Sequence, residues 1–128
     1  MSELRADTIT GSDGTSPVTL TKQSAAKAWQ SLGASGGTPS LNDSFNTSSI
    51  ADNGTGQHTL SFTNSFSSVN YSVTGSCQTS GTAQGNNSGE FRIGTLTTST
   101  EAFSTANEGQ SSYVDCPRTH IHQLGDLA

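Results

Sequence analysis

The chain has little of what ordinary globular domains are built from. Hydrophobic residues make up 29% of its 128 residues and aromatic residues 6%, against roughly 45–50% apolar residues, glycine included, in typical soluble domains. A chain so poor in apolar side chains buries only a thin core. It is then either disordered or a β-structure that completes its core by oligomerising. The strand patterns described below favour the oligomeric β-structure.

Charge is also scarce, at 12% of residues, and the five Lys and Arg residues are scattered along the chain. A net charge of −5 without a basic cluster argues against a nucleic-acid-binding surface. No apolar run approaches the roughly 20 residues of a membrane span, and the opening MSELRADTIT lacks the apolar stretch of a secretory signal. We therefore expect synthesis in a cytoplasm and no membrane insertion. In a reducing compartment we expect free thiols at Cys77 and Cys116, with a disulfide between them as the alternative.

Catalytic motifs are missing as well. The sequence contains no G-x-S-x-G, H-E-x-x-H or phosphate-binding glycine loop. Its ten acidic residues fall mostly in turns or at the ends of expected strands, where Asp commonly forms turns. Cys116 and His120 would lie roughly 13 Å apart along a strand, too far for a nucleophile and its base. We expect no enzyme activity.

The N-terminal part of the sequence predicts an arm that precedes the domain. Residues 1–20 hold two short β-prone pieces around the turn-rich GSDGTSP and predict an extended arm. Residues 33–40, GASGGTPS, predict a flexible linker. The first domain boundary is therefore expected after residue 40, with residues 1–40 serving for attachment.

Between the arm and the linker, residues 21–32, TKQSAAKAWQSL, predict one short helix. Ala25, Ala28, Trp29 and Leu32 fall at i, i+3, i+4 and i+7, which is an amphipathic helical stripe. We expect Trp29 and Leu32 to pack the arm on the domain or on a neighbouring subunit.

Residues 41–128 predict a β domain, because apolar residues recur at every second position. Asn53-Gly54 is a strong hairpin signal. Strands spaced by 8–12 residues with polar turns predict an antiparallel β-sandwich or jelly roll. The apolar faces are expected to be formed by His58, Leu60 and Phe62, by Val69, Tyr71, Val73 and Cys77, and by Phe91 and Ile93.

Two stretches carry a resemblance to a known family. LTKQSAAKAW, residues 20–29, and DSFNTSSIADNGTGQHTLSFTNSFSSVNYSVTG, residues 43–75, resemble a module of bacteriophage tail fibres and related virion fibres. The likeness continues loosely to Gly125-Asp126, although the last strand is more polar than is usual in that family. The resemblance implies a homotrimeric fibre or spike on the outside of a virion.

The resemblance also implies partners. Residues 1–20 would attach to other tail or capsid proteins of the virion, and the trimeric domain would contact a host-cell surface glycan or outer-membrane protein. The alternatives are a head fibre or capsid decoration protein with the same fold, and a polysaccharide depolymerase. Phe66 and Tyr113, in or beside loops, are the candidate receptor contacts, although either could equally belong to the core.

The last expected strand contains His120 and His122, which would point to the same face. In a trimer whose last strands approach the axis, two imidazoles from each chain would supply six nitrogen ligands, a set that suits iron or nickel better than zinc. The resemblance adds to this expectation, since His-x-His ions occur on the axis of some phage fibre and spike tips. A solvated pair and a receptor-contact or pH-sensitive interface remain open alternatives.

Overall fold

The computed structural model describes residues 26–35, 37–79, 88–107, 109 and 112–128, so the expected arm over residues 1–20 lies outside the described residues. All regular structure within these ranges is β-strand. The strands are β1 (Ala28–Ser35), β2 (Thr38–Phe45), β3 (Thr47–Gly54), β4 (Gln57–Phe62), β5 (Ser72–Gln78), β6 (Ser88–Leu96), β7 (Thr100–Asn107) and β8 (Arg118–Leu124).

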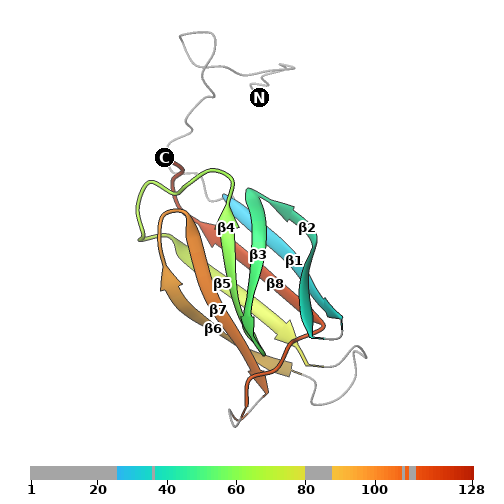
Figure 1. Ribbon diagram of the computed structural model, residues 1–128. Coiled ribbons are helices and arrows are strands. Elements are labelled where there is room, and N and C mark those ends of the chain that lie inside the picture. The colour runs from blue at the N-terminus through green and yellow to red at the C-terminus, as the bar shows by residue number, and fades with distance from the viewer. Residues whose placement is uncertain (1–25, 36, 80–87, 108, 110–111) are drawn as a thin grey trace, which may run out of the picture.

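The strands form one curved sheet in the order β2-β1-β8-β5-β6-β7-β4-β3, and every neighbouring pair is antiparallel. The two ends of this order, β2 and β3, follow each other directly in the chain, so the sheet curls into a nearly closed barrel (Figure 1). Among the described residues, β5 pairs with β6 at Cys77–Gly89 and Gln78–Ser88. The predicted antiparallel all-β domain is confirmed.

The predicted helix is wrong over the part of it that the structure describes. Residues 28–35 form β1, which pairs with β2 on one side and β8 on the other. Ala28, Gln30 and Leu32 alternate into the interior and are each at most 4% exposed. Tertiary pairing overrides the helical propensity of this segment. Of the expected linker, Gly33 lies in β1 and Gly37 lies in the β1–β2 turn.

Asn46 forms the corner where β2 continues into β3. Its φ is 57°, a left-handed conformation that Asn tolerates better than most residues. Its side chain donates to the carbonyl of Asn64 at 3.0 Å and accepts from the amide of Asn64 at 2.7 Å. These two hydrogen bonds fix the corner between β2 and β3.

The interior contains two apolar clusters. One consists of Ala28, Phe62, Phe66 and Tyr71, and the other of Leu32, Leu60, Phe103 and Ile121. In the first cluster the rings of Phe66 and Tyr71 stack with centroids 4.2 Å apart.

A row of polar side chains is buried along with these clusters. Gln123 donates to Gln30 at 3.0 Å and to Glu101 at 2.8 Å, and Gln30 donates to the Thr47 hydroxyl at 2.7 Å. Gln123 and Glu101 are 0% exposed and Gln30 is 1% exposed. Part of the interior of a single chain is therefore a hydrogen-bonded polar network rather than apolar surface.

Candidate functional site

The two histidines of the last strand lie on its outward face. Thr119, Ile121 and Gln123 point inward and are buried, whereas His120 and His122 alternate with them and are exposed. The predicted common face is confirmed. No group of three His, Cys, Asp or Glu residues able to hold a metal ion occurs in the described ranges. Two imidazoles of one chain fit a metal only as part of a set shared between chains, so the iron site stays a prediction.

The strands beside β8 place an aromatic row on the same outer face. His122 lies opposite Trp29 of β1, which lies opposite Phe45 of β2, and Thr74 of β5 flanks His122 on the other side. Trp29 is half-buried and Phe45 is 51% exposed. The neighbouring row across the same strands consists of Asp43, Ser31, His120 and Ser76.

The other predicted contact residues separate into core and surface. Leu32 packs with Leu60, Phe103 and Ile121 in its own chain, so it is not an exposed packing residue. Phe66 is 1% exposed and belongs to the core, which removes it as a receptor contact. Tyr113 is 47% exposed and remains a candidate.

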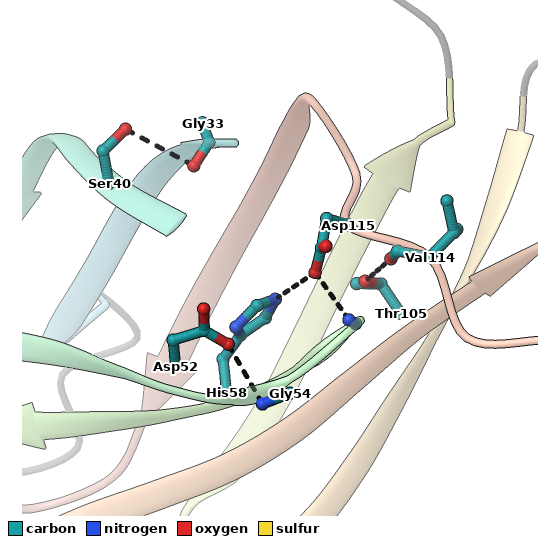
Figure 2. Close-up of polar contacts among 9 residues, drawn as sticks. Gly33, Ser40, Asp52, Gly54, His58, Thr105, Val114 and Asp115 are labelled. Carbon is teal, nitrogen blue, oxygen red and sulfur yellow. Dashed lines mark hydrogen bonds and ion pairs between the residues drawn. The ribbon is translucent and has the colours of Figure 1, made fainter. Parts of the chain in front are cut away.

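The buried His58 forms a pair with Asp115, whose side chain is 17% exposed (Figure 2). The His58 Nε2 atom lies 3.8 Å from Asp115 Oδ1, which also accepts from the amide of Gly56 at 2.6 Å. Burial lowers the pKa of His58, an effect opposed by the charges of Asp115 and Asp52. The imidazole is therefore neutral at pH 7.

Two hydroxyls drawn in the same view are hydrogen-bonded to the main chain. The Thr105 hydroxyl donates to the Val114 carbonyl at 2.6 Å, and the Ser40 hydroxyl donates to the Gly33 carbonyl at 3.4 Å (Figure 2). The other ring nitrogen of His58, Nδ1, has no hydrogen-bond partner among the described residues. The pair thus holds the β3–β4 turn against the segment before β8 and presents no nucleophile–base geometry.

Glu101 is a further buried ionisable group. Burial raises its pKa to about 7, and the hydrogen bond from Gln123 opposes this rise. Its Oε1 atom and the Oε1 atom of Gln123 have no hydrogen-bond partner within the described part of the chain. Sequence reasoning missed this residue because Glu101 was counted among acidic residues of turns and strand ends.

Cys77 and Cys116 are free thiols in the structure. They are hydrogen-bonded to each other, and this contact raises the pKa of Cys77 and lowers that of Cys116. The contact lies between β5 and the segment that leads into β8.

A groove of about 240 Å³ crosses β4, β6 and β7 and is bordered by the β7–β8 connection. Within β7, Ala102 and Ser104 of the groove alternate with the buried Glu101, Phe103 and Thr105, so the groove opens on the outside of the barrel. It is lined by Asn53, Gln57, His58, Gly94, Thr95, Ala102, Phe103, Ser104 and Tyr113. Sequence reasoning found only Tyr113 as a contact residue, because the others come from strands distant in sequence.

Comparison with protein-family models, with curated proteins and with solved structures gives no match. No helix in the described ranges is long and apolar enough to cross a membrane. Inference about function therefore depends on the residues and their arrangement.

Proposed function

We propose that the protein is a structural component of a bacteriophage virion, a tail fibre or spike that attaches the particle to its host cell. The resemblance of residues 20–29 and 43–75 to virion-fibre modules supports this proposal. Its mechanism is multivalent: several copies on a fibre, and several fibres on a particle, turn weak contacts into useful avidity. Made in the host cytoplasm, it would act on the outside of the virion.

The observation that carries the proposal is the outer face of β2, β1, β8 and β5. Its two central rows are aromatic, imidazole and hydroxyl side chains with one carboxylate, Asp43, and no Lys or Arg. Identical copies can approach such a face without strong charge repulsion, and burying Trp29 and Phe45 against another copy would add apolar area. We propose a homotrimer formed through this face, in which the two halves of the barrel act as the layers of a sandwich.

In that trimer, His120 and His122 would meet their counterparts and hold iron or another transition metal. A bound ion would stabilise the assembly by linking its three chains. Metal analysis should give one ion for each trimer of the wild type and none for the His120→Ala/His122→Ala double variant. Wild-type trimers free of metal would remove this part of the proposal.

Deleting residues 1–20 tests the place of attachment. We expect particles carrying this deletion to lack the protein on their tails, to bind host cells poorly, and to keep all other tail proteins. Loss from the head instead would favour the head fibre or capsid decoration alternative. Unchanged incorporation and unchanged adsorption would contradict both.

Release of oligosaccharide from host capsule by the purified protein would favour the depolymerase alternative. We expect no release, because the His58–Asp115 pair lacks a nucleophile and Glu101 is enclosed in the interior.

A further inference from the structure

The groove over β4, β6 and β7 has the chemistry of a site for an uncharged polar ligand. None of its nine lining residues is Lys, Arg, Asp or Glu, and its one histidine, His58, is kept neutral by burial. An anionic ligand would find no cation in this lining, and a metal ion would find no carboxylate.

The polar groups of the lining are amides and hydroxyls. Asn53 and Gln57 supply amides, which both donate and accept hydrogen bonds, and Thr95 and Ser104 supply hydroxyls. The Asn53 amide is held by donating to the Thr59 hydroxyl at 2.8 Å. Gly94 and Ala102 contribute little side-chain volume and leave space over the sheet.

Tyr113 adds an exposed aromatic ring beside these groups. Its main chain is held on both sides: Ser112 accepts from the amide of Asn107 at 3.3 Å, and the amide of Val114 donates to Thr105 at 3.1 Å. Tyr113 itself pairs with Ala106 in an isolated bridge. The segment that carries the ring is therefore positioned before any ligand arrives, which lowers the entropic cost of binding.

A sugar ring matches this combination. It presents hydroxyls that donate and accept hydrogen bonds, and a face of C–H groups that packs on an aromatic ring. The volume of about 240 Å³ is below the roughly 300–1,000 Å³ of pockets for drug-sized ligands, which fits one ring rather than a long oligosaccharide. We infer that this groove binds a single neutral sugar unit of a host-surface glycan, with Tyr113 as the stacking residue; this rests on the attachment function proposed above.

The test uses the full chain and a panel of methyl glycosides of glucose, galactose, mannose and N-acetylglucosamine, with sialic acid as the charged comparison. Saturation-transfer NMR would detect binding, and titration would give the affinity of a single site, which does not depend on avidity. We expect at least one neutral glycoside to bind and sialic acid not to bind. Binding of none of the neutral glycosides, or of sialic acid alone, would overturn the inference.

Variants locate the site. Tyr113→Ala should weaken binding about tenfold, the effect of losing one aromatic contact, and Tyr113→Phe should retain it. Gln57→Ala should weaken binding about fivefold through loss of a hydrogen bond. Val69→Ala truncates an apolar side chain that is about as exposed as Tyr113 and lies outside the groove lining, so it is the control and should leave single-site affinity unchanged. Equal affinity of Tyr113→Ala and wild type would overturn the inference.

Cell adsorption separates this inference from the proposed function. Full-length protein that binds host cells regardless of Tyr113 would refute the sugar site and leave attachment standing. Protein that binds a glycoside through Tyr113 but no host cell would refute attachment and leave the sugar site standing.

Discussion

The buried carboxyl group of Glu101 makes stability depend on pH. Glu101 is 0% exposed, and burial raises its pKa from an ordinary 4.5 to about 7. A carboxyl group whose pKa is higher in the folded state binds its proton more tightly there than in the unfolded chain. Its contribution to stability is therefore complete below about pH 4.5 and is lost as the pH rises to about 7.

The size of the effect follows from that pKa difference. Each tenfold change in proton affinity corresponds to about 1.4 kcal/mol, so raising the pKa from 4.5 to about 7 corresponds to about 3 kcal/mol. This is a large share of the roughly 5–15 kcal/mol that stabilises a typical domain. With urea m-values of about 1–2 kcal/mol/M, the unfolding midpoint should fall by about 1.5–3 M across this range.

Glu101→Gln is the informative variant, because it keeps the shape of the side chain and removes the titration. Urea unfolding from pH 4.5 to 8, followed by fluorescence of the single Trp29, should show a much flatter pH profile for the variant than for the wild type. His58, whose pKa is lowered by burial, destabilises the fold as the pH falls below its ordinary value of 6.5, but it is present in both proteins. Parallel profiles would refute the assignment of the pH effect to Glu101.

Further variants test the corner at Asn46, the turn at Gly56, and the His58–Asp115 pair. Asn46→Ala should cost about 2–3 kcal/mol in urea unfolding, through two lost hydrogen bonds and a positive φ, and Asn46→Gly should cost less; equal losses would contradict this. Gly56→Ala should cost at least about 2 kcal/mol because its Cβ would meet the β7 main chain 2.5 Å away. Gly109 also has a positive φ, of 85°, but an added Cβ would meet nothing within 4 Å, so Gly109→Ala should cost about 1 kcal/mol. Asp115→Asn should lower the pKa of His58 further in an NMR titration, since Asp115 raises it; an increase would count against the pairing.

Local signals predicted the parts of the fold that depend on alternation and turns. Asn53-Gly54 does lead into a hairpin, with φ of 128° at Gly54 and 62° at Gly56. The face expected from His58, Leu60 and Phe62 is the buried face of β4. In β4 the inward-pointing residues are His58 and two apolar residues. The two-residue period of the sequence therefore identifies the buried face directly.

The two-residue pattern of apolar residues failed to predict strands where the interior is polar. Gln30 and Gln123 occupy buried positions that pattern analysis assigns to solvent, so β1 showed a helical stripe through Ala28 and Leu32 instead of a strand alternation. The partners of Gln30 are Thr47 and Gln123, which lie 17 and 93 residues away in sequence. Contacts of that range depend on strand order, which no local pattern encodes.

The nine residues of the groove were unpredictable for the same reason. They come from β4, β6 and β7, the β3–β4 hairpin, and the segment before β8, and only the order of the strands brings them together. Tyr113 could be chosen from the sequence as an aromatic residue near a loop. Phe66 met the same criterion and is buried, because exposure is a property of the assembled barrel.

Mass in solution tests the proposed fibre most directly. Light scattering of the full chain, measured with and without a chelator, should give a species of three times 13.1 kDa, and Phe45→Ser should shift it toward smaller species because it removes an exposed aromatic side chain from the proposed interface. A wild-type protein that stays at 13.1 kDa at every concentration and melts cooperatively would contradict the trimer.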